Sequence, residues 1–161
     1  RFAMMTGRLP SRIGAYENAA ELASSLPTLA HLLRTALRMR PDRLVVGEVR
    51  GSEAVHLLQA LNTGHDGSLC TVHANSAVDA LDRLASLVMH EVGGWPMTAV
   101  VQHVARAVDV VVHLTRCANG SRRVAEVVEV APPQLADSTG FEVRSLVAGS
   151  RVVGSLGRGR V

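Results

Sequence analysis

One segment of this sequence has the residue types to act on a phosphate. Residues 43–51 read RLVVGEVRG, an apolar run that leads into the carboxylate of Glu48. A carboxylate held at the tip of a rigid strand can sit beside a Mg²⁺-bound water next to a triphosphate. An acid at a strand end is also a common structural feature, so this segment alone leaves both interpretations open.

A second segment, residues 62–76, reads NTGHDGSLCTVHANS and has polar side chains at both ends of a short apolar run. His73 follows that run, at the edge where open α/β sheets bind their ligands. Its imidazole could donate a hydrogen bond to a terminal phosphate, and a purely structural histidine is the alternative. A metal hydrolase using His65, Asp66 and His73 is a further hypothesis, although their spacing matches no standard zinc motif.

Two more polar clusters precede these segments. Glu17 opens the run ENAAEL, in which Asn18 and Glu21 have the spacing of a capping box at a helix start. Arg38 and Arg40 come just before the acidic segment. They could reach a phosphate in this subunit or a neighbouring one, or they could complement the dipole at a helix end.

Apolar periodicity predicts the elements that must position these residues. Helices are predicted over 29–39, 52–62, 78–92 and 96–107, with Ser76 capping the third and Pro96 in the first turn of the fourth. Strands are predicted over 12–16, 43–48, 67–73, 109–114, 122–130 and 141–147, with a hairpin turn at Asn119-Gly120. This alternation predicts an α/β fold with a mainly parallel sheet flanked by helices and a C-terminal β-hairpin. The tail from Gly149 is predicted to be frayed.

Length and composition limit the number of domains and the classes of partner. The chain has 161 residues, of which 47% are hydrophobic and only 2% aromatic, so one domain with a Val, Leu and Ala core is expected. No apolar stretch is long enough to cross a membrane, and the start, at Arg1, suggests a fragment rather than a signal peptide. The net charge of +3 permits contact with phosphates, nucleic acid or an anionic membrane without choosing among them. Cys70 and Cys117 have no metal-ligand spacing and are expected to be reduced and buried.

Taken together, the motifs resemble those of the type II/IV secretion ATPase superfamily, in its CpaF/TadA branch. Residues 37–51 look like the Walker B segment of that family, and residues 62–76 look like its His box. Residues 17–22 are similar to its Asp box, and 105–114 match the segment that follows downstream. The motifs occur in the family's order, and the resemblance covers roughly residues 12–130.

The resemblance implies a fold, cofactors and site residues. The fold is a RecA-like P-loop NTPase core, with 1–131 as the C-terminal part of the ATPase domain and 132–161 as a partly flexible extension. The cofactors are ATP and Mg²⁺. Glu48 would be the Walker B acid that acts on Mg²⁺ through water, Glu17 would position the attacking water, and His73 would couple the γ-phosphate to domain movement. Further candidates for phosphate or inter-subunit contacts are Arg38, Arg40, Arg50 and His65.

The resemblance also implies a homohexameric ring at the cytoplasmic face of the inner membrane. Such a ring would contact platform proteins of the membrane, would power Flp/Tad-type pilus assembly or type II/IV secretion, and is not expected to bind nucleic acid.

Three departures from the family pattern limit this expectation. The chain has no Gly-x-x-x-x-Gly-Lys-[Ser/Thr] phosphate loop, which the family carries upstream of the Asp box. The connection over 22–37 is short, and Asn18 replaces the second acid of the Asp box. The chain alone is therefore expected to have little ATPase activity. A degenerate, non-catalytic scaffold subunit of a secretion ring is the alternative.

Overall fold

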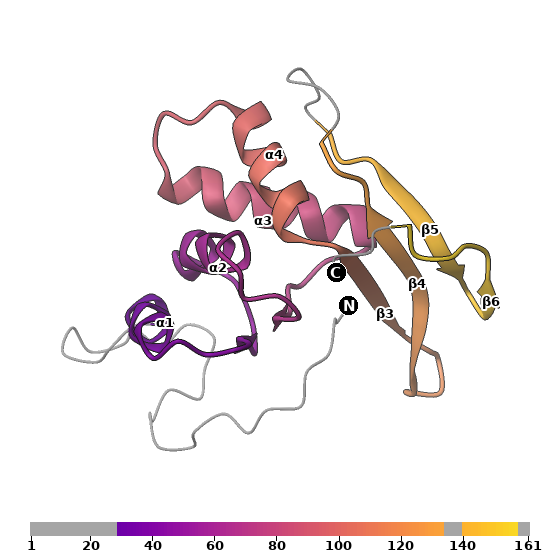
Figure 1. The fold of residues 1–161 in the computed structure, drawn as a ribbon. Helices are drawn as coiled ribbons and strands as arrows, with labels where there is room; N and C mark the ends of the chain where they lie inside the picture. Colours follow the sequence, from indigo (N-terminus) through magenta and orange to yellow (C-terminus); the bar gives the residue numbers. More distant parts are fainter. Residues whose placement is uncertain (1–28, 134–139, 158–161) are drawn as a thin grey trace.

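The computed structural model describes residues 29–133 and 140–157. Within these ranges four helices and six strands follow one another along the chain (Figure 1). The helices are α1 (Leu29–Arg38), α2 (Glu53–Leu61), α3 (Ala77–Glu91) and α4 (Met97–Ala107). The strands are β1 (Val45–Val46), β2 (Leu69–Cys70), β3 (Val110–Arg116), β4 (Arg122–Val130), β5 (Val143–Ala148) and β6 (Arg151–Val152).

Strands β1 and β2 form a two-stranded parallel sheet, in which Val45 is paired with Leu69 and Val46 with Cys70. Both strands are shorter than predicted. The apolar run of residues 44–46 suggests a strand buried on both faces, which is correct for Val46, at 4% exposed, but wrong for Val45, at 59% exposed. The paired Leu69 is 49% exposed, because no described residues cover that face of the sheet.

The other sheet is antiparallel and has the order β3-β4-β5-β6. The predicted turn joins β3 to β4, and Gly120 there adopts a positive φ of 82°, which glycine tolerates best. The prediction of a frayed tail from Gly149 is wrong up to residue 157, because β6 pairs with β5 and the backbone N–H of Gly157 donates to Glu129 at 3.0 Å. The domain division at residue 131 stays a prediction, but within the described chain β5 pairs with β4 across it.

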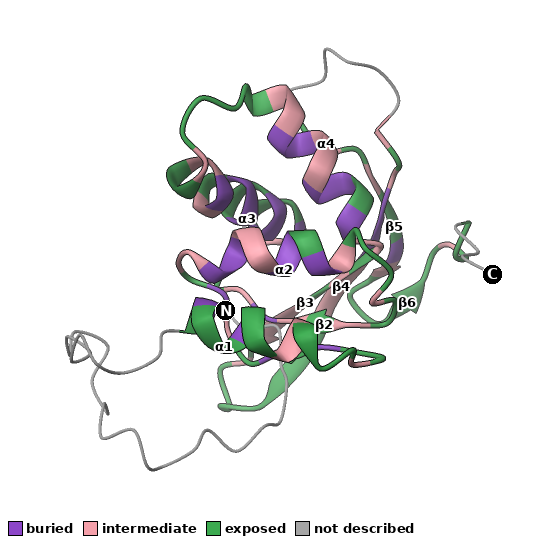
Figure 2. Ribbon diagram, turned by 60° about the vertical axis from the view of Figure 1, so that its left-hand side comes forward, coloured by how far each residue is buried: buried purple, intermediate pink, exposed green. Residues whose placement is uncertain are grey.

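Helices α2, α3 and α4 surround the core, and the four-stranded sheet lies beside α3 (Figure 1). Figure 2 shows buried residues concentrated on these helices, whereas the outer face of α1 and strand β6 are exposed. Ser76 caps α3 as predicted, since its side chain accepts a hydrogen bond from the backbone N–H of Asp79. Pro96 is the N-cap of α4, one residue earlier than predicted. In the described part of the chain, no helix combines the length and apolarity needed to span a bilayer.

Candidate functional site

The carboxyl ends of β1 and β2 bring two predicted residues together. Glu48 follows β1, and His73 follows β2. The Nε2 atom of His73 lies 3.4 Å from Oε1 of Glu48. The side chains are 44% and 41% exposed, respectively, so a ligand can reach both from solvent. The acid and the imidazole therefore lie together at one sheet edge, and their proposed roles toward a phosphate stay predictions.

Hydrogen bonds beyond the two short strands hold this edge in place. The backbone N–H of Val49 donates to the carbonyl oxygen of Thr71 at 2.8 Å. The hydroxyl of Thr71 donates back to the carbonyl of Gly47. Glu53 is 6% exposed, and its Oε1 accepts from the backbone N–H of Arg50 at 2.6 Å. Neither Thr71 nor Glu53 was predicted to support the site, although the position of Glu53 three residues after Arg50 is a local signal for such a contact.

The structure does not bring all the predicted residues to this pair. Arg38 ends α1 and Arg40 precedes β1, so both belong to the amino end of the strand whose carboxyl end leads to Glu48. Arg40 has a φ of 51°, which is uncommon for a residue with a side chain. Arg50 is exposed and lies two residues after the acid. Glu17 lies outside the described residues.

His65 is positioned at the amino end of β2. Its Nδ1 atom lies 3.0 Å from the carbonyl oxygen of Ala60, near the end of α2, and its own carbonyl accepts from the hydroxyl of Ser68 at 2.6 Å. These contacts hold the turn that leads into β2. The metal-hydrolase hypothesis is not supported, because no group of three or more His, Cys, Asp or Glu in residues 29–133 and 140–157 could hold a metal ion.

An apolar groove of about 370 Å³ lies between the two sheets. Both β2 and β3 are edge strands of their sheets in the described structure, and both line the groove. Its lining includes Leu69 and Cys70 from β2 and Val110, Val112, His113 and Leu114 from β3. Nε2 of His113 is buried and has no hydrogen-bond partner among the described atoms. Burial raises the pKa of the Cys70 thiol to about 11 by desolvating its charged form.

The chain is similar in sequence to proteins of bacterial secretion and conjugal transfer systems. Residues 21–156 match the model of a family described as "Type II/IV secretion system protein". Conjugal transfer protein TrbB of Rhizobium radiobacter is 44% identical over 117 residues, which cover 72% of this chain and 35% of that protein. Protein VirB11 of Agrobacterium fabrum is 39% identical over 87 residues, which cover 53% of this chain and 25% of that protein.

A solved structure is similar as well. The VirB11 ATPase from the Brucella suis type IV secretion system, crystallised in complex with sulphate, matches with a TM-score of 0.59 and 35% identity over 63% of this chain and 32% of that chain. This similarity confirms the predicted fold, the C-terminal part of a RecA-like P-loop NTPase core. The chain spans between 25% and 35% of the length of these three relatives.

Proposed function

Because this chain belongs to the type II/IV secretion system protein family, we propose that it forms the C-terminal part of the ATPase domain of a secretion motor. The proposed reaction is ATP hydrolysis coupled to type II/IV secretion or to assembly of a Flp/Tad-type pilus. The observation that carries the proposal is the 3.4 Å approach of His73 to Glu48 at the carboxyl ends of two parallel strands. In α/β sheets this edge is where ligands bind.

The donor set suits a Mg²⁺ ion that arrives with a nucleotide. Mg²⁺ usually keeps several waters and is held by one or two carboxylates together with substrate phosphates. Glu48 is half-exposed and offers one such carboxylate, with His73 as its neighbour. Bound Mg²⁺ would neutralise charge on the phosphates of ATP.

The chain's own residues then have separate roles. Glu48 orients water at the strand tip, and His73 donates a hydrogen bond to the terminal phosphate, which couples the nucleotide state to the loop that follows β2. We propose Glu17, which lies outside the described residues, as a second acid that positions water. Arg50 is proposed to contact phosphate or a neighbouring subunit. Arg38 and Arg40 lie at the amino end of β1, away from Glu48, so a contact with the phosphate of a neighbouring subunit or with that subunit itself is proposed for them. The contacts of His65 favour a role in the turn before β2.

The groove between β2 and β3 supports the idea that the phosphate loop lies in a part of the protein outside this chain. One strand from that part would pair with both edge strands and cover their apolar side chains. Its backbone would also supply a partner for the buried Nε2 of His113. Leu69 of the groove lining is paired with Val45, and both are exposed, so this apolar surface continues onto β1 and further chain would cover it as well.

We further propose that the whole protein forms a homohexameric ring at the cytoplasmic face of the inner membrane, in contact with platform proteins and not with nucleic acid. The motifs over 37–51 and 62–76 favour the CpaF/TadA branch of the family. The relatives TrbB and VirB11 are named as proteins of conjugal transfer and type IV secretion, so the proposed function includes those two kinds of system.

The variant Glu48→Gln in the full-length protein tests the proposed role of the acid. We expect nucleotide binding close to wild type and turnover lowered on the order of a hundredfold or more, because the amide cannot act as the base or hold the water network. Titration with nucleotide measures the binding, and the rate of phosphate release measures the turnover.

Glu91→Gln is the matched control for this experiment. Glu91 is also near a histidine, with Oε1 3.9 Å from Nδ1 of His90, and its side chain is 38% exposed, but it ends α3 rather than a strand. This control should keep full turnover. Equal turnover in wild type and Glu48→Gln would end the catalytic proposal.

The scaffold alternative makes a different prediction about the gene. A non-catalytic subunit would lack an in-frame Gly-Lys-Thr loop upstream of Arg1, and the full-length protein would not hydrolyse ATP. An intact loop would favour the motor.

A further inference from the structure

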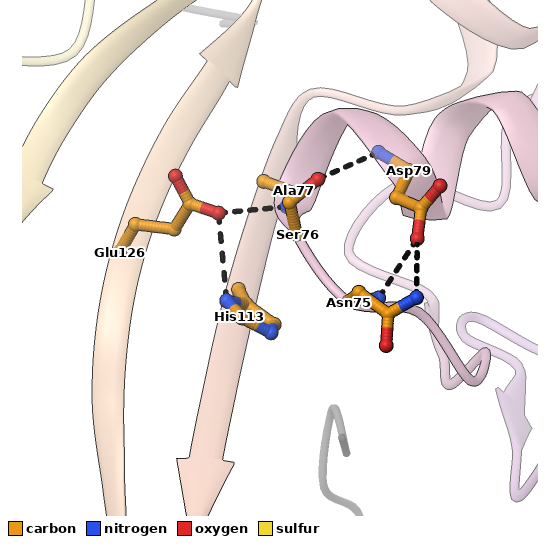
Figure 3. A network of polar contacts seen from close by, with 6 residues as sticks. All are labelled: Asn75, Ser76, Ala77, Asp79, His113 and Glu126. Carbon is orange, nitrogen blue, oxygen red and sulfur yellow. Dashed lines mark hydrogen bonds and ion pairs between the residues drawn. The ribbon is translucent and has the colours of Figure 1, made fainter.

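A carboxylate of the antiparallel sheet reaches the first turn of α3, the helix that follows the His73 loop. Oε1 of Glu126, on β4, accepts a hydrogen bond from the backbone N–H of Ala77 at 2.7 Å (Figure 3). The same oxygen lies 3.4 Å from Nδ1 of His113, on the neighbouring strand β3. The His113 side chain is 13% exposed and that of Glu126 is 34% exposed, so both contacts are partly shielded from water.

The contact satisfies a group that the local cap does not. The first backbone N–H groups of a helix have no partner within the helix. Ser76 accepts from the N–H of Asp79, and Asp79 accepts in turn from the backbone N–H and the side-chain amide of Asn75. The N–H of Ala77 is instead bonded to a residue 49 positions away. A carboxylate at this place also interacts favourably with the helix dipole.

This bond lies at the far end of the loop that carries His73. The loop begins at Thr71, which is hydrogen-bonded to both Gly47 and Val49 around β1. It ends at Ala77, four residues after His73, where Glu126 anchors it to the sheet. Between these ends, the backbone N–H of Asn75 donates a hydrogen bond to Asp79 in the first turn of α3. Both ends of the His73 loop are therefore fixed by contacts distant in sequence, one to β1 and one to β4.

We propose that Glu126 is a positioning residue for His73, held in orientation by His113, and that the antiparallel sheet and the His73 loop move as one body. This inference rests on the proposed function of His73. It predicts that a displacement of β3 and β4, for example by an adjacent subunit, changes the distance between His73 and Glu48.

The test compares variants of the full-length protein. Glu126→Ala removes the acceptor for the Ala77 N–H, so we expect kcat to fall about ten- to hundredfold, as misplacement of a group in the site does, with KM for ATP within about twofold. Glu126→Gln keeps an acceptor oxygen and is expected to retain most of the activity. Glu126→Asp keeps the charge but shortens the side chain, and should behave more like the alanine variant.

Glu129→Gln is the matched control. Glu129 lies on the same strand, is 6% exposed, pairs with Arg144 and accepts from the N–H of Gly157. Its replacement should lower the melting temperature but leave kcat unchanged, because it pairs with Arg144 of β5 and holds the C-terminal segment through Gly157. A merely structural role for Glu126 would give the same pattern as this control.

Hydrogen exchange provides a readout that does not depend on catalysis. Deuterium uptake over residues 73–77 should rise in Glu126→Ala and Glu126→Asp but not in Glu129→Gln. Wild-type kcat in Glu126→Ala, or unchanged exchange over 73–77, would overturn the inference while leaving the proposed function intact. A wild-type protein without ATPase activity would overturn the proposed function, and the exchange result would still decide whether Glu126 anchors the loop.

Discussion

The approach of His73 to Glu48 contributes little to the stability of the fold. Both side chains are about two-fifths exposed, and at such exposure even a fully charged pair is worth less than about 1 kcal/mol. The rigidity of this edge comes instead from Thr71, which is buried, and from its bonds to the backbone around β1. Because the contact between His73 and Glu48 is weak, His73 can give it up for a phosphate at little cost in free energy. The proposed sensing role of His73 requires such an exchange.

Cys70 allows a prediction at the residue scale from its titration. Burial in the groove lining raises the pKa of its thiol from 9.0 to about 11, so the folded state holds the proton more tightly than the unfolded chain. The stabilising effect is complete below pH 9 and is lost as the pH rises toward 11. We expect stability to fall over this interval, and to fall less steeply in Cys70→Ala. Urea unfolding midpoints measured from pH 8 to 11 check this, and parallel curves for the two proteins would contradict it.

At the scale of elements, the start of α3 is specified by its own sequence. Ser76 has an extended backbone, and its hydroxyl accepts from the N–H of Asp79 at 3.0 Å. We expect Ser76→Ala to lower the free energy of unfolding by about 1 kcal/mol, the usual cost of a lost N-cap. Ser86→Ala is the control on the same helix, because the Ser86 hydroxyl donates only to the carbonyl of Asp82 within the helix. That change should be neutral or slightly stabilising. An equal loss of unfolding free energy in Ser76→Ala and Ser86→Ala would show that the N-cap hydrogen bond does not stabilise α3.

The elements that the sequence predicts well are those whose signals are local. Helix α3 has both a cap and an apolar stripe, and the β3–β4 hairpin has an Asn-Gly turn. Strand β6 was not predicted, because it does not lie within a longer apolar run as β1 and β2 do, and its pairing with β5 is set by tertiary context. The contact from Glu126 to Ala77 could not be predicted, because nothing near either residue indicates a partner 49 positions away. Of the site, the pairing of Glu48 and His73 was predictable because parallel strands end at one edge.

At the scale of the whole molecule, the exposed apolar surfaces indicate where further chain belongs. Val45 and Leu69 are exposed on one face of the parallel pair, and Val110 and Val112 are exposed in the groove. Contiguous apolar surface of this kind marks an interface rather than a solvated face. The described chain covers about a third of the VirB11 structure, so the remainder of a full-length protein has ample length to cover these surfaces.

Val112→Glu tests the groove as an internal interface of the full-length protein. Val112 is 39% exposed in this structure, so in the 161-residue chain the carboxylate can remain in water, and the unfolding midpoint should change little. In the full-length protein an inserted strand would bury the new charge without a partner, and we expect a loss of several kcal/mol together with a loss of ATPase activity. Val152→Glu is the control, because Val152 is 81% exposed on β6 and does not line the groove. It should be tolerated in both proteins. If Val112→Glu is equally mild in the full-length protein, the groove remains open to solvent and the phosphate loop must reach the Glu48–His73 edge by another route.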